Sequence, residues 1–135
     1  MRPRQRTEDA GQATAFSVVM AGALLLLAAF VFDVGSALAQ RSAALHTAQE
    51  AARVGAQQID LGLYRTEGTV TLEPGQAAAA AEDHLEAAGM RGSATVQGEA
   101  VTVTAHTTAS FALLPLPERT ASGTASATPL TTDAP

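Results

Sequence analysis

An uncharged, strongly apolar run near the N-terminus limits what this chain can fold into more than any other feature. No side chain in residues 10–32 is charged, and residues 18–32 are almost wholly apolar. A helix that crosses a hydrocarbon core of about 30 Å needs about 20 such residues. The run therefore predicts a transmembrane helix over residues 13–33.

The charges on either side of this run predict its orientation. Arg2, Arg4 and Arg6 precede it, and Asp33 is the first residue after it. Basic residues beside a span favour the cytoplasmic side of the membrane. We therefore expect residues 1–12 to form a basic cytoplasmic N-terminus, and we expect a single-pass protein of the cell membrane with its C-terminal part outside the cytoplasm.

The same region also has the features of a signal peptide. Ala37, Leu38 and Ala39 form a small-x-small cleavage pattern before Gln40. Against that reading, the uncharged run is longer than the usual apolar core of a signal peptide, and the helical pattern continues across the cut. The sequence favours a retained anchor, with cleavage after Ala39 as the alternative.

A helical pattern continues over residues 34–60, which we expect to extend the span outside the membrane. An apolar stripe recurs every seven residues, and a row of small residues recurs every four. Both faces predict close packing, either on the C-terminal part of the same chain or against a partner helix, and the sequence leaves the two open. The stripe is Leu38, Leu45, Ala52 and Ile59, and the row is Ala44, Ala48, Ala52 and Ala56, joined by Ala51 and Gly55.

Residues 61–128 carry the signals of a small α+β domain. We expect a short strand over residues 69–72, and a helix over residues 76–88 that Pro74 opens and Gly89 ends. Residues 93–97 and 101–108 predict two strands joined by a turn at Gly98, and residues 119–128 predict a last strand. Valines alternate with threonines in the second of these strands, which predicts an antiparallel sheet with one buried face. Residues 129–135 are expected to be a disordered tail.

Residues 111–117 are the most apolar segment outside the N-terminal run. They include Phe111, Leu113 and Leu114, together with two prolines that make the segment a poor strand. An exposed apolar loop indicates contact with a partner or a membrane surface. The alternative is that the loop folds back over the sheet as a lid of the core.

Asp33 is the one polar residue at the end of the span that invites a role. A charge within a span is costly and often functional. At the outer boundary, however, an aspartate can simply mark where the lipid ends. The sequence therefore leaves two interpretations of Asp33, a boundary marker or a contact with another span.

The chain lacks the residue patterns that catalysis requires. His46, His84 and His106 are not at helical spacing from one another, and no metal-binding or phosphate-binding motif is present. The net charge of −5 argues against a nucleic-acid partner. We therefore predict a protein that is not an enzyme, with no cofactor, no metal and no small-molecule substrate.

Three marks connect the N-terminal part to a known family: Gly11-Gln12 before the apolar run, Asp33-x-Gly35 after it, and Gln49-x-Ala51-Ala52 in the alanine-rich helix. With these marks, the first 60 residues resemble the start of TadE/TadG-like proteins of tight-adherence (Flp-type) pilus assembly. The resemblance implies a pilin-like, single-span protein that acts as a minor pilin or assembly factor. Members that a prepilin peptidase processes carry Glu at the fifth position after the cleavage-site glycine. Phe16 stands at that position after Gly11, which implies the TadG-like branch that is retained in the membrane.

The predicted fold class is α+β, with one long N-terminal transmembrane and stalk helix followed by a small antiparallel sheet and one packed helix, as in pilins. The predicted function is a membrane-anchored structural or assembly protein of a tight-adherence pilus or related secretion apparatus, which contacts other membrane proteins of that apparatus through helix packing. The alternative is an extracytoplasmic binding module, anchored or released after Ala39. The candidate partner contacts are Asp33, Leu38, Leu45, Ala52, Ile59, Phe111, Leu113 and Leu114.

Overall fold

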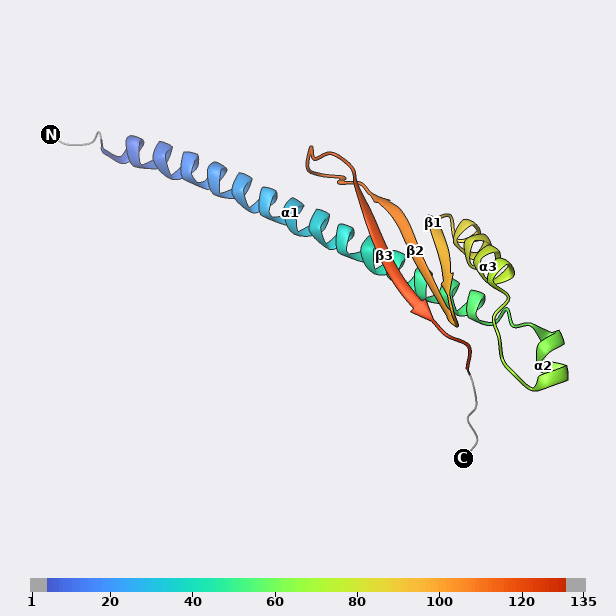
Figure 1. Cartoon of the computed structure of the whole chain (residues 1–135). Coiled ribbons are helices and arrows are strands. Elements are labelled where there is room, and N and C mark those ends of the chain that lie inside the picture. Colours follow the sequence, from blue (N-terminus) through green and yellow to red (C-terminus); the bar gives the residue numbers. More distant parts are fainter. Residues whose placement is uncertain (1–4, 131–135) are drawn as a thin grey trace, which may run out of the picture.

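The protein is a long helix with a small domain built onto its second half (Figure 1). The computed structural model describes residues 5–130, with side chains from residue 11 onward. Arg2, Arg4 and the predicted tail after Leu130 lie outside the described residues. The arrangement confirms the predicted α+β class, with one long apolar helix, a three-stranded antiparallel sheet and a packed helix.

Helix α1 (Gln5–Ala56) is continuous through the apolar run and the alanine-rich segment. Its 52 residues make a helix about 78 Å long at 1.5 Å per residue. It ends earlier than expected, because Gln57 and Gln58 donate to the carbonyls of Val54 and Gly55 in tighter turns. Ile59 therefore lies beyond the helix.

The link after α1 contains a short helix, α2 (Leu61–Glu67), that the sequence analysis did not predict. The Asp60 side chain caps its start, accepting from the N–H groups of Gly62 and Leu63 at 2.8 and 3.0 Å. Gly68 ends it in a left-handed conformation, with φ of 69°. The strand predicted at residues 69–72 was wrong, since that segment forms only a single bridge between Ile59 and Leu72.

The remaining elements follow the predicted order. Helix α3 (Pro74–Ala87) is followed by strands β1 (Arg91–Gln97), β2 (Ala100–Ala109) and β3 (Arg119–Ala127). The sheet has the order β1-β2-β3 and both pairings are antiparallel. Gly98 makes the tight β1–β2 turn at φ of 60°, a conformation that favours glycine.

The core lies where the second half of α1 crosses one face of the sheet, with α3 packed beside it. Most of its members are alanines, and its largest fully buried apolar side chains are Leu85, Val101 and Val103. Small side chains form this core because they let the backbones of α1 and the sheet approach each other closely. A Cβ atom at Gly123 of β3 would meet the α1 backbone at Leu45. The stability of this thin core thus depends on close approach more than on large buried side chains.

Candidate functional site

The first half of α1 is covered by almost no other part of the chain. We call residues 11–32 the apolar segment, and within it every residue is exposed except Ala29, which is half-buried. Its large side chains are 45% exposed at Met20 and up to 72% exposed at Leu25. The segment is about 33 Å long as a helix, close to the thickness of a hydrocarbon core. Within residues 5–130, α1 is the one helix that is long and apolar enough to cross a membrane.

Asp33 follows this segment directly and makes the most distinctive polar contact of the molecule. It is only 1% exposed. Its carboxylate accepts hydrogen bonds from the backbone N–H groups of Ala112 at 3.1 Å, Leu113 at 3.2 and 3.3 Å, and Leu114 at 2.7 Å. Three successive amides that converge on one anion form a nest-like site, and a charged acceptor strengthens each bond.

We call this arrangement the Asp33 contact. It joins α1 to the β2–β3 loop (residues 110–118), which reaches α1 near its middle in Figure 1. The structure thus gives Asp33 a partner within its own chain, a possibility that the sequence analysis did not consider. A contact of Asp33 with another span stays a prediction.

The β2–β3 loop has an unusual backbone in this region. The N–H groups of residues 112–114 go to Asp33, and Leu116 donates to the Leu114 carbonyl at 2.7 Å. Pro115 and Pro117 have no N–H to donate. Every backbone donor from residue 112 to residue 117 is therefore either paired or absent.

The side chains of the loop point mostly away from the core. Leu113 is 59% exposed and Leu116 is 50% exposed, while Phe111 and Leu114 are half-buried. None of these four belongs to the buried core cluster. The loop is therefore an apolar projection held by the Asp33 contact, and the lid interpretation does not describe it. A partner contact through Phe111, Leu113 and Leu114 stays a prediction.

The seven-residue stripe of α1 is divided by the structure. Ala52 is fully buried in the core, where the row of small residues packs on the sheet and α3. Leu38 is 68% exposed and Leu45 is 39% exposed. These two leucines line an open groove beside β3, together with Arg41, Ser42, Ser122, Gly123 and Thr124. Leu38 and Leu45 are thus the exposed members of the stripe on α1, and their contact with a partner stays a prediction.

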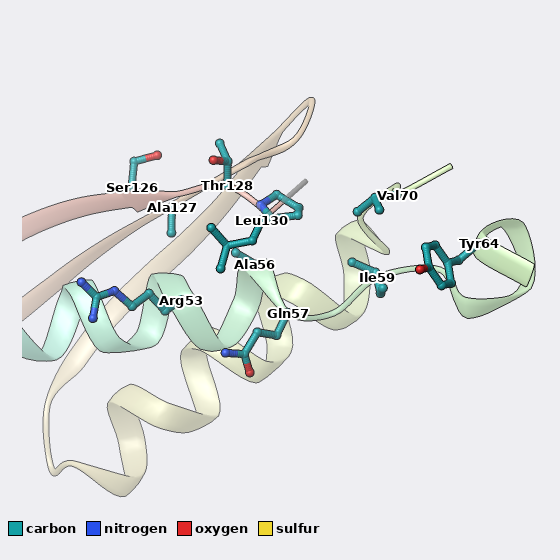
Figure 2. A pocket seen from close by; sticks show the side chains of 11 residues that line it. Arg53, Ala56, Gln57, Ile59, Tyr64, Val70, Ser126, Ala127, Thr128 and Leu130 are labelled. Carbon is teal, nitrogen blue, oxygen red and sulfur yellow. The ribbon is translucent and has the colours of Figure 1, made fainter. Parts of the chain in front are cut away.

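Ile59 lies at the far end of the molecule, in a hollow of about 660 Å³. Figure 2 shows that the hollow is lined by the end of α1, the link to α2, α2 itself, and the residues at and after the end of β3, including Arg53, Tyr64 and Leu130. Nearby, α2 buries none of its residues and exposes Leu61, Leu63 and Tyr64. A partner contact through Ile59 stays a prediction.

Polar side chains elsewhere act as links between elements. His84 of α3 faces Glu50 of α1, with 3.6 Å between Nε2 and Oε2. Glu82 accepts a hydrogen bond from the Ala94 N–H at 3.2 Å.

In the part of the chain that the structure describes, no group of three or more His, Asp or Glu residues is placed to hold a metal ion. That the protein is not an enzyme stays a prediction.

Comparison with known proteins adds one finding to this geometry. No curated protein and no solved structure gives a significant match. The match that exists covers about a third of the chain, and it contains the whole apolar segment, Asp33 and the buried alanine row. It associates this part of the chain with pilus assembly: residues 11–58 match the family model Tad, described as "Putative Flp pilus-assembly TadE/G-like".

Proposed function

We propose that this protein is a membrane-anchored, pilin-like structural or assembly protein of a Flp-type pilus apparatus. One observation carries the proposal: the unbroken helix α1 joins an uncovered apolar segment to the alanine face that holds the domain. The family match over residues 11–58 includes both the segment and this face. Such a helix fixes the domain at a set height above the membrane, because no flexible linker separates the two.

The arrangement of charges supports an orientation for this anchor. Arg2, Arg4 and Arg6 precede the apolar segment, which favours a cytoplasmic N-terminus. The domain on residues 33–130 then lies outside the cytoplasm. In that position the groove at Leu38 and Leu45 is presented just beyond the membrane, where helices of other apparatus proteins can pack against it.

The Asp33 contact supports retention of the anchor over release. Cleavage after Ala39 would remove Asp33 and leave the N–H groups of residues 112–114 without their acceptor. It would also cut α1 in the middle of a regular helix. Cleavage after Gly11 would leave the apolar segment and the Asp33 contact intact.

The test is carried out in the native host. Deletion of the gene should abolish Flp-type pili on the cell surface, and the wild-type copy should restore them. The protein should be found in the membrane fraction, with an intact mass that retains the apolar segment. Normal piliation after deletion, or a protein in the medium that starts at Gln40, would contradict the proposal.

A pair of variants tests the helix-packing surface within that experiment. Leu38→Glu combined with Leu45→Glu should reduce piliation while the protein stays in the membrane at its normal level. Leu61→Glu on α2 is the matched control, since Leu61 is 54% exposed but lies at the far end of the domain. Equal piliation in the two variants would exclude the groove as the assembly surface.

A further inference from the structure

The position of the β2–β3 loop relative to the apolar segment suggests what it touches. Asp33, which holds the loop, is the residue immediately after Phe32. One turn earlier on the same helix face, Ala29 is half-buried, whereas the rest of the apolar segment is exposed. The Asp33 contact therefore places the loop directly beside the end of the segment that we propose to lie in the membrane.

The backbone N–H groups of the loop are suited to surroundings with little water. An unpaired N–H that is moved out of water loses its hydrogen bond without a replacement, which is costly. In this loop the donors from residue 112 to residue 117 are all paired or absent. The Asp33 carboxylate accepts three of these hydrogen bonds while it is itself almost fully buried, so neither partner is left uncompensated.

The side chains of the loop have matching chemistry. Residues 110–117 carry no charged side chain, and the next charged residues along the chain are Glu118 and Arg119 at the start of β3. The side chains of Leu113 and Leu116 are 59% and 50% exposed. Apolar side chains that dip into the boundary between headgroups and acyl chains gain free energy in proportion to the area that they bury.

We infer that the β2–β3 loop is a second, interfacial membrane contact that docks the domain onto the outer leaflet. This inference rests on the proposed membrane anchor. The occupant of the loop surface is lipid, because the loop continues the apolar surface of the span at the level where the span ends. A protein partner that added a strand would need free backbone donors, and residues 112–117 offer none.

Two contacts constrain the protein more than one. A span alone leaves the domain free to tilt and rotate with the helix axis. With the loop in the interface, one face of the domain is held against the membrane, and the groove at Leu38 and Leu45 points in a fixed direction. The Asp33 contact then holds the loop at the level where the span ends.

The experiment uses the full chain, which contains no cysteine, in vesicles of phosphatidylcholine and phosphatidylglycerol. Single nitroxide labels are attached at Leu113→Cys and Leu116→Cys. Leu61→Cys on α2 serves as the exposure-matched control, and Leu25→Cys reports on the span. The collision rates of each label with oxygen, which concentrates in lipid, and with a water-soluble nickel complex give its depth.

The labels at positions 113 and 116 should collide more with oxygen than with nickel, which places them at or below the headgroups. The label at position 61 should show the reverse. If positions 113 and 116 are as accessible to nickel as position 61 while position 25 lies in lipid, the loop inference fails and the anchor stands. If position 25 is also in water, both proposals fail.

Two further outcomes keep the inference open to contradiction. Labels at positions 113 and 116 that are shielded from both reagents would indicate a protein contact, such as a second copy, and would overturn the inference. Asp33→Ala should move the label at position 116 into water without moving the label at position 25. An unchanged label at position 116 in that variant would remove Asp33 from the mechanism.

Discussion

The two halves of α1 are equally helical, but the first carries large exposed side chains and the second carries small buried ones on one face. The apolar segment carries large residues such as Leu25 and Phe32, and nearly all of it is exposed. The second half carries alanines and Gly55 on one face, and that face is buried. Asp33 marks the point at which one regime changes to the other.

This difference shows how one helix can have two kinds of neighbour. Lipid chains adapt to any shape, so large side chains can be left uncovered by the protein without a packing penalty. A sheet is rigid, and it approaches the helix backbone only where side chains are small. Exposure of large residues and burial of small ones is the reverse of the usual soluble pattern. A helix whose first half lies in lipid is expected to show this pattern.

The largest expected effect separates the two halves by their tolerance of charge. Leu25 and Leu38 are similarly exposed, at 72% and 68%. Leu25→Arg should cost about 2.5–3.5 kcal/mol of membrane insertion, as a charge at the centre of a span does. At 1.4 kcal/mol per factor of ten, this is a loss of roughly 60-fold to 300-fold in the insertion equilibrium. Leu38→Arg should insert normally. Membrane fractionation with an insertion reporter measures the insertion of both variants. Equal insertion would show that the proposed span does not end between Leu25 and Leu38.

The next effect separates the halves by their tolerance of volume. Ala48→Leu forces three extra carbons between α1 and the sheet, where Ala48 is fully buried. Overpacking of this kind costs about 1–3 kcal/mol, and this thin core places the variant at the upper end. Ala23→Leu adds the same atoms at an exposed position of the apolar segment. Thermal unfolding in detergent, followed by circular dichroism, should show a lower midpoint for Ala48→Leu and an unchanged midpoint for Ala23→Leu.

The third effect concerns the residue between the two halves. Asp33→Ala leaves three amides without their acceptor. Loss of one partner of a buried hydrogen bond costs about 1–3 kcal/mol, and access of water to the freed loop moves the cost toward the lower end. Asp33→Asn keeps one carbonyl oxygen and should lose less. Hydrogen exchange of the amides of residues 112–114 should accelerate most in the alanine variant. Unchanged exchange in both variants would show that Asp33 does not hold the loop.

The sequence predicted the local elements better than the contacts between them. The apolar run placed α1, Pro74 and Gly89 placed α3, and the valine–threonine alternation with the turn at Gly98 placed β1 and β2, because these signals depend on neighbouring residues. The short helix α2 was not predicted, although Asp60 and Gly68 are good caps, because glycines such as Gly62 and Gly68 around a short segment are also typical of a turn.

The Asp33 contact could not be predicted, because it joins residues about 80 positions apart and its donors are backbone amides with no sequence signature. The stripe misled for a related reason. An ideal helix drifts by about 20° per heptad, so Leu38 and Ala52 are only about 40° apart around α1 and their different burial depends on which part of α1 the domain covers. Ala52 is buried in the core, whereas Leu38 is exposed.

The smallest expected effect tests whether close approach, and not helix propensity, governs the buried half. Gly35 and Gly55 are both in α1, but a Cβ at Gly35 would meet nothing within 4 Å. At Gly55 it would meet the Ala77 carbonyl oxygen at 2.8 Å and Val101 Cγ1 at 2.9 Å. Alanine is the better helix former by about 0.8–1 kcal/mol. Gly35→Ala should therefore raise the free energy of unfolding by up to about that amount, whereas Gly55→Ala should lower it, because the clash outweighs the gain in propensity. Unfolding midpoints that move in the same direction would mean that α1 and α3 can separate at no cost, and the buried alanine face would then not be what holds the domain on the helix.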